Sequence, residues 1–372
     1  VTSGSSSLEN RRAIYTTYNN INVWFDTLKQ FLTTKGFARN KRENEEGDGE
    51  LVFFPGQLNR ILNLDESGLT LDGNQGKSGG RSSTRFGCSN PSIPQGMDRT
   101  NKSSTRITFI GGSTAAGHPL PPHFQLKSVA TDENKPIQTK FLEGLPFVYG
   151  VYGANKLVKS GATVNCNASA GMDATEFRKF ILDAIVPLYP NAAEKDGRRV
   201  LLILDSGPGR KDENLLSFLA ARGFHLLPGV PNTTHVTQPT DQNYGYFKSM
   251  YRSNLEKLVH NRRSKNDSVR QTDISLLVLG NQGQQEELML EPAFDNAFSV
   301  ERSAAVWLKI GISPFTRKCL RDSKVGHELI LLPDGTIDLD ADPLSLVLIE
   351  LEEKNEKAIG VLNEGGFNGD VF

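Results

Sequence analysis

Five consecutive apolar residues, Val200 to Leu204, are followed directly by Asp205 and a turn. A continuous apolar run of this length, bounded by glycine and proline at 207–209, predicts a strand that is buried on both faces. Asp205 then stands at the carboxyl end of that strand, which is the edge where ligands bind in open α/β sheets. The run therefore constrains the chain to an α/β fold with a functional edge.

The residues after this strand continue the α/β pattern. Residues 213–222 have apolar side chains at helical spacing, and Gly223 follows as a stop signal. Residues 224–227 predict a second short strand. A polar loop then leads to Asp241, which opens a long amphipathic helix. Upstream, another short apolar strand is predicted to end at Asp65.

Three aspartates thus lie at predicted strand or helix ends: Asp65, Asp205 and Asp241. One aspartate at such a position is usually a turn or cap residue. Three in one α/β domain indicate a metal site instead, because carboxylate oxygens suit Mg²⁺ or Mn²⁺. Two such ions about 3.5–4 Å apart can stabilise the attacking and leaving oxygens of phosphoryl transfer.

Three sequence blocks carry a family resemblance: NLDES, LLILDSGPG and PNTTHVTQPTDQNYGYFKSMYR. Between about residues 60 and 260 they resemble the mariner and pogo branch of the DDE superfamily of transposase-like endonucleases. The last block is the most specific, and the 35 residues between Asp205 and Asp241 are close to the spacing of that branch. The resemblance implies an α/β, ribonuclease H-like three-layer fold. Its mixed central sheet would be flanked by helices, with N-terminal helical and C-terminal appendages.

The resemblance also implies a chemistry and partners. Asp65, Asp205 and Asp241 match the metal-binding acids of the family, which use two Mg²⁺ or Mn²⁺ ions to hydrolyse DNA. The freed 3′ hydroxyl then attacks target DNA. The expected partners are transposon ends and target DNA, and we expect a nuclear protein that is a homo-oligomer when active. Relatives often have a histidine where this chain has Arg210.

Further residues are expected to support this site. Glu66 stands beside the first acid, as in many relatives, while Asn232, Thr233 and Gln238 precede Asp241 and could orient a phosphate or a water. Turn chemistry explains Asn232 equally well. Basic residues on the helix after Asp241 are expected to meet DNA phosphates, which gives affinity without reading sequence. A solvated face is the alternative for these residues, namely Lys248, Arg252, Arg262 and Arg263.

Composition narrows the protein class. The chain has 372 residues, of which 37% are apolar and 23% charged, as in soluble globular proteins. It has no long uncharged apolar window and no apolar run at its start, so neither a membrane span nor a signal peptide is expected. Three dispersed cysteines argue against zinc and disulfides. The net charge of −1 is uneven, because residues 321–372 carry 12 acidic and 4 basic residues.

We expect four regions. Residues 1–50 form a helical segment and linker, and 51–265 form the catalytic domain, with an exposed insertion at about 72–104. Residues 266–320 form a helical extension, and 321–372 form an acidic tail. The pattern over 8–35 predicts a helix on the catalytic core, or alternatively the end of a helix-turn-helix region.

Several shorter sequence patterns predict structural features and not catalytic residues. Residues 105–110 alternate like a strand, and Asp173 with Glu176 forms a capping box at the start of a helix. One helix is expected within 294–316. The sequence GNQGKSGG lacks the first glycine of a phosphate-binding loop, because Leu71 occupies that position. His118 and His123 lie near turns and are not expected to bind metal.

The function indicated is a metal-dependent DNA endonuclease and strand transferase of a transposable element. Two alternatives remain open. The first is a domesticated, transposase-derived protein that binds DNA or a partner without cutting. The second is a host ribonuclease H-like nuclease that lacks strand transfer.

Overall fold

The computed structural model describes residues 15–70, 106–129, 132–136, 163–205, 207, 209–264, 290–322 and 325–326. The insertion predicted at 72–104 and nearly all of the acidic tail lie outside these residues. The proposed domain boundaries stay a prediction.

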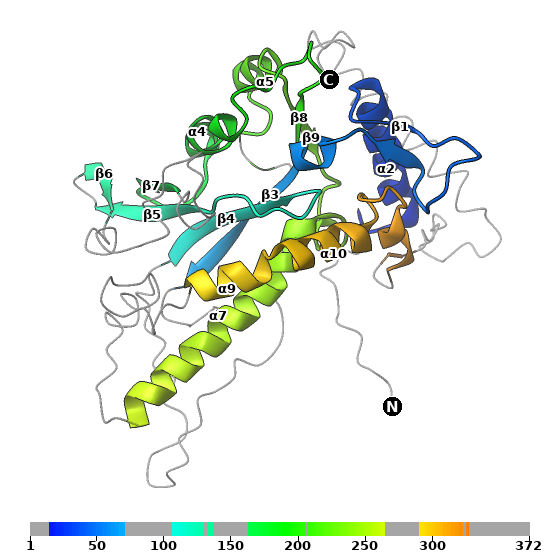
Figure 1. The fold of residues 1–372 in the computed structure, drawn as a ribbon. Helices are drawn as coiled ribbons and strands as arrows, with labels where there is room; N and C mark the ends of the chain where they lie inside the picture. Colours follow the sequence, from blue (N-terminus) through cyan, green and yellow to red (C-terminus); the bar gives the residue numbers. More distant parts are fainter. Residues whose placement is uncertain are drawn as a thin grey trace, which may run out of the picture.

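A seven-stranded sheet forms the centre of the molecule (Figure 1). Its strand order is β6-β5-β4-β3-β8-β9, and β7 pairs with β5. The strands are β3 (Ile61–Thr70), β4 (Arg106–Thr114), β5 (His123–Val129), β6 (Asp132–Pro136), β7 (Thr163–Asn167), β8 (Val200–Leu204) and β9 (Phe224–Pro228).

The pairing of these strands is mixed. β3, β4 and β5 form an antiparallel meander, while β8 pairs in parallel with β3, and β9 pairs in parallel with β8. All five residues of β8 are buried, as the apolar run at 200–204 predicted. Three antiparallel strands extended by two parallel ones, with helices on both faces, form the ribonuclease H-like arrangement that the sequence blocks implied.

Helices on one face of the sheet come from the middle of the chain. They are α4 (Ala174–Phe180), the single-turn helices η3 (Ile181–Ile185) and η4 (Val186–Leu188), and α5 (Glu213–Ala220). Their apolar residues share one core with Leu62, Leu202 and Leu204 of the sheet. Asp173 caps α4 by accepting a hydrogen bond from the Glu176 amide at 2.9 Å, which confirms the predicted capping box.

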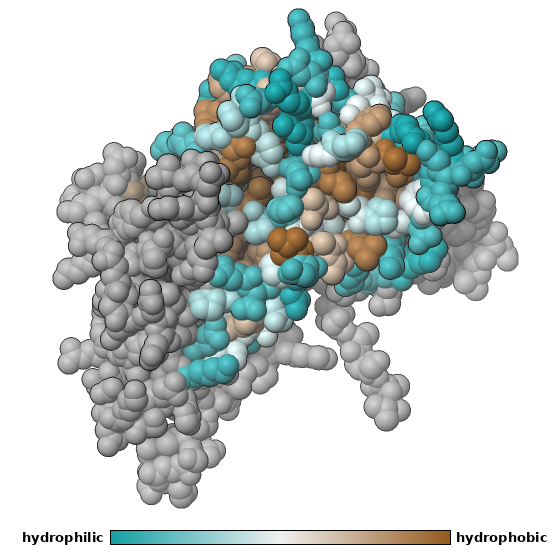
Figure 2. Space-filling model, in the orientation of Figure 1, coloured by the Kyte–Doolittle hydropathy of each residue, from teal (hydrophilic) through white to brown (hydrophobic). Residues whose placement is uncertain are grey.

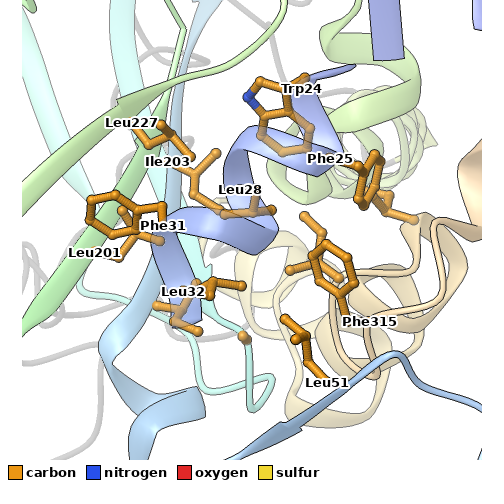
Figure 3. Close-up of a cluster of buried hydrophobic side chains, with 14 of the residues drawn as sticks. Trp24, Phe25, Leu28, Phe31, Leu32, Leu51, Leu201, Ile203, Leu227 and Phe315 are labelled. Carbon is orange, nitrogen blue, oxygen red and sulfur yellow. The ribbon is translucent and has the colours of Figure 1, made fainter. Parts of the chain in front are cut away.

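Helices from both ends of the described chain cover the other face. These are α2 (Tyr18–Thr34), α6 (Thr234–Thr237), α7 (Pro239–Ser264), α9 (Leu290–Ala297), α10 (Val300–Ile310) and η6 (Lys318–Arg321). Figure 3 shows α2 packing Leu28 and Phe31 toward Leu201 and Ile203 of β8. The expected packing of this helix on the core is therefore confirmed, and its described part begins at Tyr18, after the cap residue Thr17.

Two predictions of local structure are corrected. Residues 36–50 were expected to be a linker, yet β1 (Ala38–Asn40) pairs with β2 (Leu51–Phe53) because Phe37 and Ala38 are buried beside α2. The single helix expected within 294–316 is two helices, α9 and α10. Ser299 separates them by capping α10, and its side chain accepts a hydrogen bond from the Arg302 amide.

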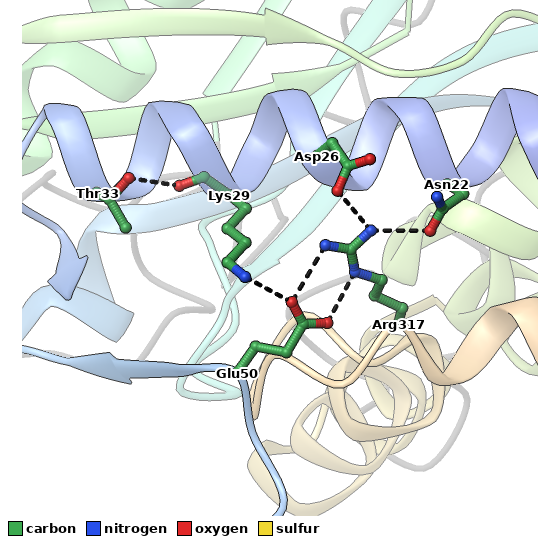
Figure 4. A network of polar contacts seen from close by, with 6 residues as sticks. All are labelled: Asn22, Asp26, Lys29, Thr33, Glu50 and Arg317. Atoms are coloured by element: carbon green, nitrogen blue, oxygen red, sulfur yellow. Dashed lines mark hydrogen bonds and ion pairs between the residues drawn. The ribbon is translucent and has the colours of Figure 1, made fainter. Parts of the chain in front are cut away.

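Arg317 holds these outer elements together (Figure 4). Its guanidinium pairs with Glu50 at 2.8 Å and with Asp26 of α2 at 2.6 Å, and it also donates to the Asn22 side chain. Lys29 of α2 contributes a second cation to Glu50 at 2.8 Å. Residues from three distant parts of the sequence are thereby fixed against the same face of the sheet.

The outer surface is mostly polar over α9 and the described part of α7 (Figure 2). Large exposed apolar side chains are few among the described residues, and two of them, Val300 and Leu308, lie on α10. Within the described ranges, no helix combines the length and the apolar character needed to cross a membrane.

Candidate active site

Asp205 lies where the sequence predicted, directly after the last residue of β8. The neighbouring strand β9 ends beside the end of β8, where the Gly229 amide donates a hydrogen bond to the Leu204 carbonyl at 2.7 Å. The side chain of Asp205 is 39% exposed, so it is accessible from solvent at the carboxyl edge of the two parallel strands.

Asp65 is not at a strand end, which corrects the prediction. β3 continues for five more residues and pairs with β4 as far as Thr70, whereas its pairing with β8 ends at Asn63. The polar residues after Asp65 concealed this extension in the sequence. Because β3 projects beyond β8, Asp65 is central in its own strand and still lies at the edge where β8 ends.

Successive side chains of β3 point to opposite faces of the sheet. Leu62 and Leu64 belong to the core beneath α4 and α5, whereas Asn63 contacts the start of α7. Asp65 therefore faces the α7 side, and Glu66 faces the α4 side. The two neighbouring acids are separated by the sheet itself.

Asp241 occupies the first turn of α7, close to the predicted helix start. Its Oδ2 atom lies 3.5 Å from the Thr234 hydroxyl, at the hydrogen-bond limit. An acid in the first turn of a helix is favoured by the partial positive charge of the free amides there. The same turn is fixed to the sheet by Asn63.

Asn63 is fully buried and joins the three elements that carry the aspartates. Its amide group donates to the Ile203 carbonyl of β8 at 2.9 Å, and its side-chain oxygen accepts from the Thr240 amide of α7 at 2.9 Å. The Thr240 hydroxyl donates to the Asn63 carbonyl at 3.0 Å. Sequence reasoning missed this residue, although a polar residue inside an apolar strand was a usable signal.

Tyr244 gives a second connection, one turn into α7. Its hydroxyl donates to the Asp65 carbonyl at 2.6 Å and accepts from the Gly111 amide at 2.6 Å. The sequence predicted no role for this ring beyond that of the amphipathic helix. Its hydroxyl instead sets the position of the backbone that carries Asp65 relative to α7.

The electrostatics of the site show which acids lie near one another. Burial is the main cause that raises the pKa of Asp65, and the negative charges of Asp241, Asp205 and Glu66 add to it, so that the pKa is about 7. A hydrogen bond from the Glu66 amide to the Asp65 carboxylate acts in the opposite direction. The fold thus brings Asp205 and Asp241 close enough to Asp65 for their charges to act on it.

Arg210 makes a contact that sequence reasoning did not anticipate. Its guanidinium forms an ion pair with Glu66, and its Nε atom lies 3.3 Å from Asp205 Oδ1. The side chain is 7% exposed and lies 4.1 Å above the ring of Phe177 on α4. Burial raises the pKa of Glu66, and Arg210 opposes that shift.

The loop before Asp241 is largely internal. Thr233 is buried, and its hydroxyl donates to the Val230 carbonyl at 2.9 Å. Gln238 is also buried, beside Gly229 and the end of β8. Asn232 is exposed and has a positive φ of 62°, a conformation that asparagine tolerates better than most residues.

The basic residues predicted to contact DNA all lie on α7. Arg252 is exposed and Lys248 is half-buried. Arg262 and Arg263 belong to the last turns of the same helix, and their side chains are outside the description.

The site fits a divalent cation in donor type and charge, since the carboxylates of Asp205 and Asp241 lie near that of Asp65 and their charges act on it. The spacing is wider than that of a metal centre: among the described residues, no three acids, histidines or cysteines are close enough to share an ion. One oxygen of Asp205 is also paired with Arg210. Coordination by all three aspartates therefore requires side-chain rotation.

His118 is exposed, and the pKa of His123 is lowered to about 4 by burial.

Comparison with solved structures gives distant similarities. One is a pre-cleavage Mos1 transpososome, with 11% identity, coverage of 88% of this chain and 67% of that chain, and a TM-score of 0.42. Another is the Mos1 mariner paired end complex with Mn, with 11% identity, coverage of 88% and 67%, and a TM-score of 0.40. The catalytic domain of Mos1 mariner transposase has 11% identity, coverage of 87% and 98%, and a TM-score of 0.36.

No curated protein sequence matches the chain significantly. A family model described as DDE superfamily endonuclease matches residues 108–297, which is slightly more than half of the 372-residue chain. The matched range contains Asp205 and Asp241, whereas Asp65 precedes it. On the strength of this match, the chain belongs to the DDE superfamily endonucleases.

Proposed function

We propose that the protein is a metal-dependent DNA endonuclease and strand transferase of a transposable element. Asp65, Asp205 and Asp241 are the proposed metal ligands and catalytic residues. The observation that carries the proposal is the effect of the other two aspartates on Asp65, whose pKa burial and their charges raise to about 7. Membership in the endonuclease family supports the same conclusion.

When bound, two Mg²⁺ or Mn²⁺ ions supply charge that offsets the scissile phosphate, and they lower the pKa of a water. The chain's own residues position the ligands. Asn63 and Tyr244 hold β3, β8 and the first turns of α7 together through buried hydrogen bonds. Such pre-organisation matters because ligands that are misplaced by about 1 Å cost about 10²-fold in rate.

DNA is the proposed substrate, and the basic residues of α7 are its proposed phosphate contacts. Lys248 and Arg252 follow Asp241 along one helix, and Arg262 and Arg263 continue the series. Contacts of this kind weaken steeply with salt, because each releases counterions from the DNA. Assembly of two or more copies on DNA, and a nuclear location, belong to the same proposal.

The test is nicking of supercoiled DNA with Mg²⁺ or Mn²⁺. Asp205→Asn keeps the side-chain shape and removes the charge, so nicking should fall by about 10²–10³-fold. Asp183→Asn is the matched control, because Asp183 is an exposed acid on η3. Equal nicking by the parent and Asp205→Asn would reject the site. A labelled 3′ end that joins a second DNA separates a transposase from a simple nuclease.

One observation favours the second candidate, a domesticated protein that binds DNA or a partner without cutting. Arg210 already pairs with Asp205, one of the three proposed ligands. The same assay distinguishes the two candidates, because a domesticated protein binds DNA and leaves the plasmid intact with either metal.

A further inference from the structure

The contacts of Arg210 extend the proposed function, on which this inference rests. Four acids surround the site, and two of them, Glu66 and Asp205, share this one guanidinium. The side chain of Arg210 is 7% exposed, whereas those of Glu66 and Asp205 are 28% and 39% exposed. A cation buried this deeply cannot serve as a phosphate contact for an entering DNA strand.

The position of Arg210 is fixed from three directions. Phe177 of α4 provides an aromatic face 4.1 Å from its Cζ atom, which is a favourable cation–π distance. Glu66 approaches from the α4 side of β3, and Asp205 approaches from the end of β8. A planar guanidinium suits such a bridge because its donors point in several directions at once, which a lysine ammonium matches less well.

We propose that Arg210 is a positioning residue that serves as an internal counter-ion of the acidic site. It neutralises Glu66, the fourth carboxylate, which lies on the opposite face of the sheet from Asp65. It also forms an ion pair with one oxygen of Asp205, so its positive charge competes with a divalent cation for that carboxylate.

This arrangement makes opposite predictions for the two partners. Arg210→Gln removes a competing cation and adds one net negative charge near the metal ligands. By Coulomb's law in water, one such unit charge beside a divalent ion would change its affinity by about tenfold. Glu66→Gln has the reverse effect, because Arg210 is then left to pair with Asp205 alone. The double variant restores the charge and should bind cations with about the parent's affinity.

The experiment measures Mn²⁺ binding to the DNA-free protein by titration calorimetry, after removal of metal with EDTA. We expect Arg210→Gln to bind Mn²⁺ about tenfold more tightly, and Glu66→Gln several-fold more weakly. Arg210→Lys, which keeps the charge, should remain close to the parent. Arg178→Gln is the matched control, because Arg178 lies on the same α4 helix as Phe177 and pairs with Asp212 at 3.4 Å.

The outcomes separate this inference from the proposed function. If Asp205→Asn abolishes Mn²⁺ binding while Arg210→Gln and Glu66→Gln both match the parent, Arg210 is only a structural contact and the inference fails. If Asp205→Asn binds Mn²⁺ like the parent, the proposed function itself fails. Thermal melting in EDTA identifies a variant that does not fold. Should Arg210→Gln be one, the weaker binding of Glu66→Gln and the parent-like binding of Arg210→Lys decide the question.

Discussion

In the absence of metal, Asp65 should make the free energy of unfolding smaller at neutral pH than in mild acid. Burial, together with the charges of Asp241 and Asp205, raises the pKa of this carboxyl to about 7. The protein therefore carries an acid whose ionisation the fold opposes. Replacement by asparagine removes the charge and keeps the shape, so Asp65→Asn isolates the electrostatic cost of that one carboxylate.

The sign follows from proton binding. An unfolded aspartate loses its proton near pH 4, whereas Asp65 in the folded protein keeps its proton up to about pH 7. Between these values the folded state binds more protons, so stability falls as pH rises and levels off above pH 7. A difference of about 3 pH units corresponds to about 4 kcal/mol, at about 1.4 kcal/mol for each unit.

The measurement is urea unfolding of the parent and Asp65→Asn in EDTA, at pH 4.5 and at pH 8. At pH 8 the variant should be more stable by up to about 4 kcal/mol, and at pH 4.5 the difference should shrink to about 1 kcal/mol or less. Added Mg²⁺ should stabilise the parent and leave the variant unchanged. A variant that is no more stable than the parent at pH 8 would refute the reasoning.

Two other substitutions test how the site is held together. Asn63→Ala leaves the buried Thr240 amide and the Ile203 carbonyl without their partner, so unfolding free energy should fall by about 3 kcal/mol and cleavage should fall with it. Urea unfolding and initial cleavage rates check this result, and an unchanged midpoint contradicts it. Arg317→Ala should cost about 1–2 kcal/mol, since it removes a half-buried ion pair with Glu50 that includes more than one contact. Thermal melting should show a lower melting temperature for this variant, and DNA cleavage at 25 °C, the control, should be normal. Loss of cleavage in a variant that is still folded would contradict a purely structural role for Arg317.

Sequence patterns predicted the elements whose residues are buried on both faces. The run at 200–204 became β8, because a parallel strand in the centre of a sheet needs apolar residues at every position. Residues 224–227 became β9, the neighbouring strand at the end of the sheet, where most residues are still buried. The capping box at Asp173 was predicted for a similarly local reason, since cap and partner lie three residues apart.

The errors occurred where a distant partner decides the structure. β3 continues past Asp65 through polar residues because β4 pairs with it to the end. β1 forms within an apparently polar linker because Phe37 and Ala38 pack beside α2. No local pattern contains either partner, so composition alone favoured a strand end and a linker.

The acidic residues of the candidate site could be predicted from the sequence, but the hydrogen bonds and ion pairs that position them could not. Asp205 and Asp241 could be placed from the strand and the helix beside them. The roles of Asn63, Tyr244 and Arg210 depend on contacts between residues more than 100 positions apart. Asn63 and Arg210 nevertheless gave a signal, as a polar residue in an apolar strand and as a departure from a family pattern.

The central claim is that Asp65, Asp205 and Asp241 hold the same metal ions. Its most direct test is Mn²⁺ binding to the DNA-free protein, measured for the parent and for each aspartate changed singly to asparagine, with Asp183→Asn as the control. We predict that each of the three substitutions abolishes or greatly weakens Mn²⁺ binding and that the control binds normally. Parent-like binding after any one of the three substitutions would contradict the claim.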